Sequence, residues 1–492
     1  LNLLFKYTGV MEKIQSLAFW KKPSVILALI LAAFFLKGVF LTALFPIFVG
    51  QDEARHYSSI QYISEPRPAF WPIIEREQTA EDTILKYNYS QESRETARAV
   101  DFDKANEDLY STSDFTNNYD GKNEDLINNN NWHQYNEYSP PNIAKISLYH
   151  RTASLIEKNF GDQSILVRYF LARIFSVLLG ALTVLLSYFI ARNIGLSAKH
   201  SLIITAIVAF QPRFSIYSAA INYDILLILI FALFTLGGVL ALKHGLNWKN
   251  LLLMSISIVC GILTKPTAYL LILAVCLLFS YFAYEKIKNK LKYAKYIVFC
   301  VFIFLAIFAT IYIDRKFTGG FSGSENIVSS IGKYLSKSFT LGSLGLSSRT
   351  YWGALGWVNN WFLDKTTNII WIIQLIAAAG IGVLLFSKKE KPEFLPEKKY
   401  VVFLLAMIVL LQAGIRFADW SLFHKLGQIE IGTPGRYFLP NIAAHIILVF
   451  TGLGMLLRKK GYFEKSLIFG LILMMTFMLY IIFDVIILRY YL

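Results

Sequence analysis

Long apolar runs alternate with short basic stretches along almost the whole chain, and no other feature constrains the fold as strongly. Many of these runs approach or exceed the roughly 20 residues that an α-helix needs to span a bilayer. Of the 492 residues, 55% are hydrophobic and only 16% are charged. Soluble domains carry about a quarter charged residues. The sequence therefore predicts an all-α polytopic membrane protein.

We predict eleven transmembrane helices from the apolar runs. They cover about 24–48, 165–190, 201–217, 225–242, 250–263, 267–284, 296–313, 367–386, 400–417, 437–457 and 466–488. Lys13, Lys21 and Lys22 precede the first run, and the connections assigned to the cytoplasm hold 22 Lys and Arg residues. Because basic residues favour the cytoplasmic side, we expect the N-terminus inside and the C-terminus outside.

This topology divides the chain into five parts. They are the N-terminus and first span (1–49), a large extracytoplasmic loop with amphipathic helices (50–164), spans two to seven (165–313), a second extracytoplasmic loop (314–365) and spans eight to eleven (366–492). Within the first loop, helices are predicted from Asp52 to Ile63 and over 143–159, and the proline- and aromatic-rich residues 66–72 are expected to lie on the membrane surface. Composition leaves open whether residues 75–130 are ordered.

The net charge of +15 does not indicate nucleic-acid binding. Residues 50–164 hold 20 acidic and 11 basic residues, a net of −9, so the rest of the chain carries +24. Much of that excess lies in short loops between apolar runs, where membrane topology explains it. The three cysteines, at 260, 276 and 300, lie in or beside apolar runs, so no disulfide framework is indicated.

The chain carries an unusual acidic pair where the first span ends. Asp52 and Glu53 directly follow this span, and His56 comes one helical turn later. Acids at a membrane boundary are costly unless they are paired, hydrated or used. A carboxylate here can deprotonate a hydroxyl or hold a metal ion, with His56 as a further ligand. Purely structural roles stay open as well, since the acids can cap a helix N-terminus and His56 can be an exposed helix-face residue.

Cationic residues are expected on the same side of the membrane. Arginine and lysine bind phosphate well, and arginine offers planar two-pronged contacts. The candidates for binding the phosphate of a lipid-linked donor are Arg168, Arg173, Lys265 and Arg436. Further site candidates are Arg213, Asn222, Asp224 and Arg416. Each can also have a structural role, such as interface anchoring by an arginine or helix capping by Asn222 and Asp224.

Several short motifs resemble those of GT-C-type membrane glycosyltransferases. The stretch Gln51 to His56 is similar to the Asp-Glu-x-x-His signature that follows the first helix of that superfamily. A group of bacterial polytopic proteins within it is also similar at three further places: Ser139-Pro-Pro141, Asn222-Tyr-Asp224 and Gly435-Arg-Tyr-x-x-Pro440. Leu263-Thr-Lys-Pro266 resembles the lysine-containing turn of lipid-phosphate-sugar transferases.

The resemblance implies an inverting transferase in the bacterial inner membrane, with its active site facing the extracytoplasmic side. It implies a polyprenyl-phosphate sugar lipid as donor and a glycan, lipid or protein as acceptor. An acid of the first loop, which maps to Asp52, is the expected base or metal ligand, and Glu53 and His56 are expected to assist it in catalysis. A divalent metal such as Mg²⁺ or Mn²⁺ serves some members and not others, so the metal is left open.

Two further function classes remain in view. A transporter or flippase for a lipid-linked glycan would carry polar residues near the midplane of several spans. This chain instead concentrates them at the predicted outer ends. A non-catalytic envelope assembly partner, with the acidic loop as its binding surface, is the second alternative.

Overall fold

The computed structural model describes residues 22–50, 52–64, 92, 93, 96, 146–287, 327–353, 361–387, 390–426, 433–488 and 491, with the side chains of the helix at 361–386 from residue 365 onward. Within these ranges the secondary structure is helical and contains no strand. The predicted seventh span, the surface piece at 66–72, the Ser139-Pro-Pro141 turn and, apart from residues 92, 93 and 96, the stretch 75–130 lie outside the described residues.

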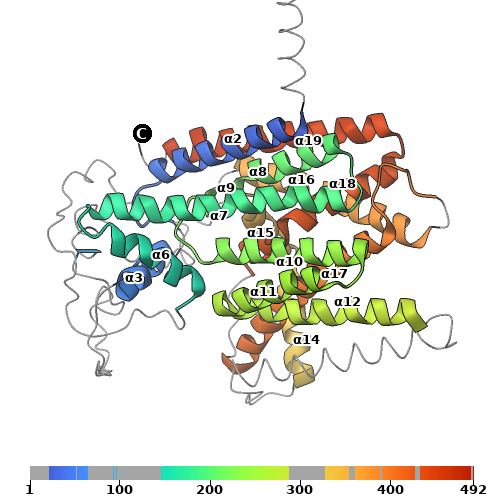
Figure 1. Ribbon diagram of the computed structural model, residues 1–492, viewed down its shortest axis with the longest axis horizontal. Helices are drawn as coiled ribbons and strands as arrows, with labels where there is room; N and C mark the ends of the chain where they lie inside the picture. The colour runs from blue at the N-terminus through green and yellow to red at the C-terminus, as the bar shows by residue number, and fades with distance from the viewer. Residues whose placement is uncertain are drawn as a thin grey trace, which may run out of the picture.

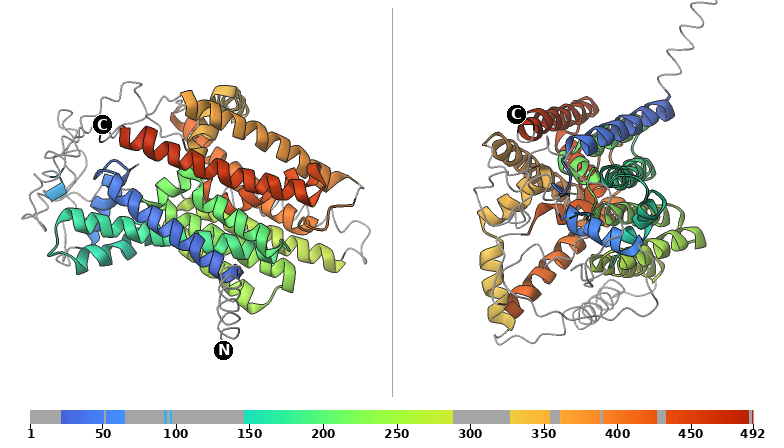
Figure 2. Two further views of the ribbon diagram at one scale, coloured as in Figure 1. Left: turned by 90° about the horizontal axis from the view of Figure 1, so that it is seen from above. Right: turned by 90° about the vertical axis from the view of Figure 1, so that its left-hand side faces the viewer.

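Long helices run side by side in one bundle, and their direction alternates along the chain (Figures 1 and 2). Eight helical segments of the described residues are long and apolar enough to cross a membrane. They are α2 (Pro23–Leu44), α7 (Ile165–Asn193), α10 (Asp224–His244), η3 with α12 (Pro266–Tyr269 and Leu270–Ile287), α16 (Trp361–Phe386), α17 (Lys398–Leu426), η4 with α18 (Gly435–Asn441 and Ile442–Leu457) and α19 with η5 (Lys460–Tyr480 and Ile481–Ile487). These helices confirm the prediction of an all-α protein with several candidate membrane spans.

Two predicted spans are shorter apolar helices, namely α8 (Ala198–Phe210) and α11 (Trp248–Thr264). The third predicted run, 201–217, is interrupted because Pro212 begins a separate short helix, α9 (Pro212–Ser218). Proline lacks the N–H that would continue the helix of the preceding residues. The Gln211 side chain caps α9 by accepting from Phe214 N–H. The count of eleven spans and the N-in orientation therefore stay predictions.

The bundle packs closely where small residues face each other. A Cβ atom added to Gly380 of α16 would lie 2.0 Å from the carbonyl oxygen of Gly452 in α18. Such glycine contacts let the backbones of membrane helices approach each other and gain packing energy. The central helices α10 and η4–α18 are the most enclosed, with 72% and 78% of their apolar windows buried. They therefore form the core against which the loop elements rest.

Shorter helices gather at the ends of the long ones. α3 (Glu53–Ser64) packs against α6 (Leu148–Asn159) beside the start of α7, at the left of Figure 1. The helices predicted at the start and end of the first loop correspond to these two. In the second loop, α14 (Ile327–Ser338) packs on α17, while α15 (Leu341–Trp352) packs on η4. These contacts hold the described helices of both predicted outer loops against the long helices.

Candidate functional site

The turn between α2 and α3 is held in place by Arg173 of α7. The guanidinium group donates to the carbonyl oxygens of Phe45 (2.5 Å) and Pro46 (2.8 Å), and to that of Thr42 at the end of α2 (3.0 Å). The last carbonyl groups of a helix, such as that of Thr42, have no partner within the helix. Arg173 therefore fixes the path by which the chain leaves α2.

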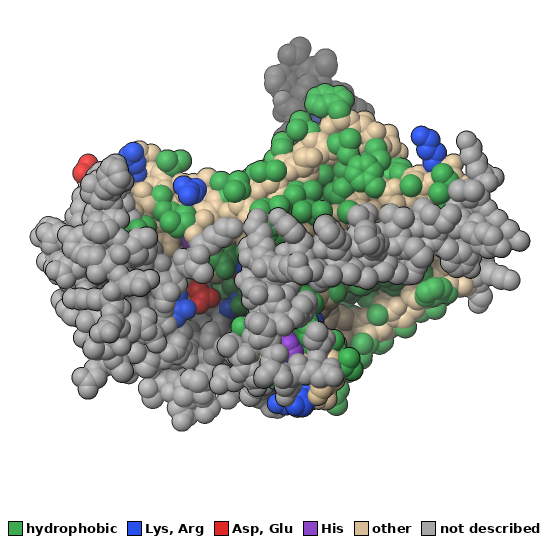
Figure 3. Space-filling model, turned by 90° about the horizontal axis from the view of Figure 1, so that it is seen from below, with side chains coloured by type: hydrophobic (Ala, Val, Ile, Leu, Met, Phe, Trp, Pro, Cys, Tyr) green, Lys and Arg blue, Asp and Glu red, His purple; other side chains and the backbone are tan. Residues whose placement is uncertain are grey.

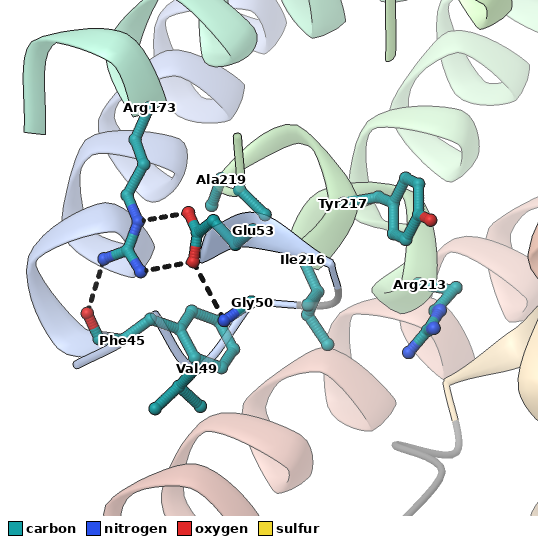
Figure 4. Close-up of a pocket in the computed structure, with 10 residues that line it drawn as sticks. Phe45, Val49, Gly50, Glu53, Arg173, Arg213, Ile216, Tyr217 and Ala219 are labelled. Atoms are coloured by element: carbon teal, nitrogen blue, oxygen red, sulfur yellow. Dashed lines mark hydrogen bonds and ion pairs between the residues drawn. The ribbon is translucent and has the colours of Figure 1, made fainter. Parts of the chain in front are cut away.

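The carboxylate of Glu53 is fully occupied. Its Oε1 and Oε2 atoms each lie 2.7 Å from a nitrogen of Arg173, which makes a two-pronged ion pair (Figure 4). The same oxygens accept from the amide of Gly50 at 2.8 Å and that of Ile221 at 2.9 Å. The side chain of Glu53 is 0% exposed. Glu53 thus joins the turn to both α7 and the segment before α10.

Two residues of this turn adopt a left-handed backbone conformation, Phe48 with φ 69° and Asp52 with φ 57°. Left-handed φ values are uncommon outside glycine, although aspartate tolerates them better than bulky residues do. The Phe48 amide donates to the Tyr169 hydroxyl at 3.2 Å. Backbone strain of this kind persists only where the surroundings hold it, and it gathers at functional sites.

Asp52 points into a different environment from Glu53. Its side chain is 35% exposed, and its Oδ2 lies 3.5 Å from Nη2 of Arg436. The Arg436 guanidinium packs on the ring of Tyr437, 4.9 Å from the centroid, and Nη2 lies 3.3 Å from the Tyr437 hydroxyl. Asp52 is therefore an accessible carboxylate beside a buried cation from η4, which lies far along the chain.

Lys265 approaches the same tyrosine from another helix end. It follows α11 directly, and its Nζ lies 2.7 Å from Oδ1 of Asp224. The ammonium group also lies over the rings of Tyr223 and Tyr437, 4.9 and 4.8 Å from the centroids. Cations are attracted to aromatic faces at such distances. Tyr437 thus has Arg436 and Lys265 on its ring, and the two cations share one site.

The turn before α10 is ordered by its own side chains. Asn222 Oδ1 accepts from the amide of Asp224 at 2.8 Å, and Asn222 Nδ2 donates to the Tyr217 hydroxyl at 3.2 Å. The N-cap of α10 is Tyr223, which makes no capping hydrogen bond, so Asn222 orders the turn before the helix and does not cap it, while Asp224 both begins α10 and pairs with Lys265. We call the residues Asp52, Asp224, Lys265, Arg436 and Tyr437 the mixed-charge cluster. Figure 3 shows acidic and basic side chains together in a hollow of one face.

His56 lies against a second histidine that the sequence did not single out. Its Nδ1 is 2.9 Å from Nε2 of His150 in α6. The ring of Tyr223 packs edge-on against His56 with a centroid distance of 4.7 Å. Burial and the positive charges of Lys265 and Arg436 lower the pKa of His56 to about 3. Burial and His56 itself lower the pKa of His150 well below its usual value. Both rings are therefore neutral at physiological pH.

Arg168 lies in a separate buried network. It forms ion pairs with Glu92 and Glu157, and all three side chains are at most 1% exposed. Tyr57 donates to Glu157 at 3.0 Å, and Gln61 donates to Glu92 at 3.0 Å. Arg168 of α7 thus faces α3 and α6 and pairs with two carboxylates, and it lies outside the mixed-charge cluster.

Arg213 of α9 lines a pocket together with Tyr217, whose ring lies 5.4 Å from the guanidinium carbon. The pocket has about 370 Å³ of empty space, part of it open to solvent. Figure 4 shows Arg213 and Tyr217 on the side opposite the Glu53–Arg173 pair. Its other lining residues are mainly apolar: Phe45, Val49, Gly50, Ile216, Ala219 and Ala220.

Arg416 lies in the second half of α17, in contact with the second loop. Its Nη1 donates to the Thr433 hydroxyl at 2.8 Å, and the guanidinium carbon is 5.4 Å from the centroid of the Phe339 ring. The Thr433 hydroxyl in turn donates to Asp419 at 2.8 Å. These contacts tie residue 433, just before η4, to α17.

The three predicted metal ligands do not fit a metal site of their own. The oxygens of Glu53 are taken by Arg173 and two backbone amides, and His56 directs Nδ1 at His150. Of the three, Asp52 alone presents an open carboxylate. The described residues contain no group of three or more His, Cys, Asp or Glu side chains arranged for a metal ion.

The structure brings Asp52, Asp224, Lys265 and Arg436 together, with His56 linked to them through Tyr223. It places Glu53, Arg173 and Arg168 in buried ion pairs and Arg416 beside the second loop. Sequence reasoning missed His150, Tyr217, Tyr223 and Tyr437. Tyr223 and Tyr437 had a detectable signal, since each stands inside a quoted motif. His150 had none, because a single histidine in an amphipathic helix has no distinguishing pattern.

Searches among curated proteins and among solved structures found no match. Residues 145–321 match the family described as dolichyl-phosphate-mannose-protein mannosyltransferase. Arg168, Arg173, Arg213, Asn222, Asp224 and Lys265 fall inside this segment, whereas Asp52 and Arg436 fall outside it. Together with the apolar helices, the match supports the predicted membrane glycosyltransferase of the GT-C type.

Proposed function

We propose that the protein transfers a sugar from a polyprenyl-phosphate donor to a hydroxyl group of a glycan, lipid or protein acceptor. The reaction takes place at the extracytoplasmic face of a bacterial inner membrane. The family match supports the donor class, since members of that family use lipid-phosphate sugars. The side of the membrane rests on the distribution of basic residues in the sequence.

The observation that carries the proposal is the placement of Asp52 in the mixed-charge cluster. An accessible carboxylate lies 3.5 Å from Arg436, and Arg436 shares the Tyr437 ring with Lys265. A carboxylate that reaches solvent can accept a proton from a hydroxyl group. Two cations beside it can stabilise the charge that builds on a departing phosphate. The cluster therefore supplies the groups that this transfer needs.

In the proposed reaction, Asp52 takes the proton of the acceptor hydroxyl while the hydroxyl oxygen attacks the anomeric carbon of the donor sugar. The bond between this carbon and the phosphate oxygen breaks, and its electron pair leaves with the phosphate. Arg436 and Lys265 hold the phosphate and stabilise its additional negative charge. A single displacement inverts the anomeric carbon. Polyprenyl phosphate is released into the membrane, and the proton remains on Asp52 until water removes it.

Not every predicted site residue takes a chemical role in this proposal. We assign Glu53 and Arg173 to holding Asp52 in place, because both are engaged in the buried pair beside it. Arg168 is assigned to the packing of α3 and α6 on α7. Arg213, at the pocket next to the turn, remains a candidate for contacting the donor, while Arg416 supports the segment before η4. Asn222 holds the turn that presents Asp224 to Lys265.

The test is Asp52→Asn in purified protein reconstituted with polyprenyl-phosphate sugars. Removing the base should lower transfer by at least roughly 100-fold, the usual size of general-base catalysis. A matched control is Glu464→Gln, an acid paired with Lys199 through contacts away from the cluster, which should retain transfer. Full activity of Asp52→Asn would remove Asp52 from catalysis. If the wild type transfers no sugar but moves such lipids between leaflets of liposomes, the transporter alternative replaces the proposal.

A further inference from the structure

His56 and His150 form a buried pair between two loop helices. The side chains come from α3 and α6, 94 positions apart, and their facing nitrogens are 2.9 Å apart. His150 is 0% exposed and His56 is 5% exposed. Buried histidines are kept with a fixed arrangement of protons when each ring nitrogen has a defined partner. The partners of His150 determine that arrangement here.

The backbone of Ser147 fixes the proton on His150. Ser147 N–H lies 3.1 Å from Nδ1 of His150, and the Ser147 hydroxyl oxygen lies 2.9 Å from the same atom. A backbone N–H can only donate, so Nδ1 must accept. In a neutral imidazole, the other nitrogen then carries the hydrogen. His150 therefore donates from Nε2 to Nδ1 of His56.

This donation also fixes the proton on His56. Since Nδ1 of His56 accepts, the hydrogen of the neutral ring is on Nε2. Among the described residues, no hydrogen bond is made to Nε2 of His56. Tyr223 packs edge-on against the His56 ring, and Lys265 Nζ lies 4.9 Å from the centroid of the Tyr223 ring. Tyr223 therefore connects the histidine pair to the mixed-charge cluster.

We propose that His150 is a positioning residue that holds His56 in its Nε2–H form, so that His56 donates a hydrogen bond to a substrate oxygen at the mixed-charge cluster. The substrate oxygen belongs to the phosphate or to the sugar of the donor. This inference rests on the proposed function, because that function identifies the molecule at the cluster. The proton arrangement itself depends only on the contacts of Ser147, His150 and His56.

Two substitutions of one residue separate positioning from helix capping. In His150→Asn, the amide occupies the place of Nδ1 and keeps the contact with Ser147, but it does not reach His56. In His150→Gln, the amide NH₂ occupies the place of Nε2 and can still donate to His56. Each full-length variant is purified in lipid nanodiscs, and thermal unfolding checks that both are folded.

Two measurements are then compared with the wild type. The ¹⁵N chemical shifts of the His56 ring report which nitrogen carries the hydrogen, with His56→Gln used to assign the signal. Transfer from a polyprenyl-phosphate sugar reports activity. We expect the wild type and His150→Gln to keep the hydrogen on Nε2 and to keep transfer. We expect His150→Asn to lose the fixed Nε2–H form and to lose roughly 10- to 100-fold in transfer, the size of a hydrogen bond to a charged group.

Three results would overturn the proposal. The first is a wild-type His56 with its hydrogen on Nδ1. The second is His150→Asn with an unchanged Nε2–H signal, because capping alone would then account for His150. The third is loss of that signal with full transfer, which would disconnect the tautomer from the reaction. If the wild type transfers no sugar at all, the proposed function fails, while the ring signals still decide the positioning role.

Discussion

Asp52 and Glu53 are neighbours in the chain, yet their carboxylates lie in opposite surroundings. Glu53 is fully buried, with both oxygens held by Arg173 and by two backbone amides. Asp52 is 35% exposed and meets Arg436 at 3.5 Å. A buried carboxylate with this many donors has no capacity left for a substrate. An open carboxylate with one longer contact retains it.

The cations divide in the same way. Arg168 and Arg173 bind glutamates inside the packed region around α3, α6 and α7. Lys265 and Arg436 instead share the faces of tyrosines, and each also meets an aspartate. A charged residue at a membrane boundary is therefore not informative by itself. The number and rigidity of its partners decide between a role in the fold and a role in chemistry.

Breaking the buried pair of Glu53 and Arg173 should destabilise the protein more than any other change considered. Glu53→Gln leaves the Arg173 charge buried among backbone carbonyls, and loss of one partner of such a pair costs about 3–5 kcal/mol. We expect a large fall in the free energy of unfolding, measured by thermal or denaturant unfolding in detergent. Asp52→Asn, the same type of change one position earlier, is the matched control and should unfold nearly as the wild type does. Equal stability of the two variants would remove the contrast between these acids.

A second prediction is that the folded protein loses stability as the pH falls. The pKa of His56 is lowered to about 3 in the folded protein, from an ordinary value near 6.5 in the unfolded chain. Below pH 6.5 the unfolded chain binds a proton that the folded protein excludes. Stability is therefore fully present above pH 6.5 and is lost as the pH falls towards 3, by about 1.4 kcal/mol per pH unit for one such histidine.

Unfolding temperatures measured between pH 7.5 and pH 5 check this prediction. His150 adds to the effect because its pKa is also lowered by burial, and Lys265, Arg436 and Arg55 all disfavour a charged His56. The double variant His56→Gln/His150→Gln lacks both titrating rings and should show a flatter dependence on pH. A wild-type unfolding temperature that does not change over this range would contradict the burial of neutral rings.

Most of the long helices, and the grouping of several site candidates, could be predicted from the sequence. Apolar runs predicted the long helices because a span must bury its own backbone polar groups, so its hydrophobic length is visible in the chain. Asp52, Lys265 and Arg436 were all expected on one side, and the structure brings them together. Helix ends on one side of a bundle necessarily gather polar residues, which made this grouping predictable.

The pairing of individual charges was not predictable. Whether Arg173 binds Glu53 or a substrate depends on contacts between residues 120 positions apart. The His56–His150 pair likewise depends on how α3 packs on α6. The break at Pro212 was also missed, because the apolar run continues through it and hydropathy does not register a lost backbone donor. These features depend on tertiary geometry, for which a linear pattern carries no signal.

The ion pair between Asp52 and Arg436 should contribute little to folding. The carboxylate is about one-third exposed and the contact is long, so solvent screens it, and exposed pairs of this kind contribute about 0–1 kcal/mol. A double-mutant cycle with Asp52→Asn and Arg436→Gln should therefore give a coupling free energy below about 1 kcal/mol in unfolding. The same cycle with Glu53→Gln and Arg173→Gln should give several times more. A strong coupling between Asp52 and Arg436 would show that this pair stabilises the fold as the buried pairs do. It would contradict the inference that the Asp52 carboxylate is available to a substrate.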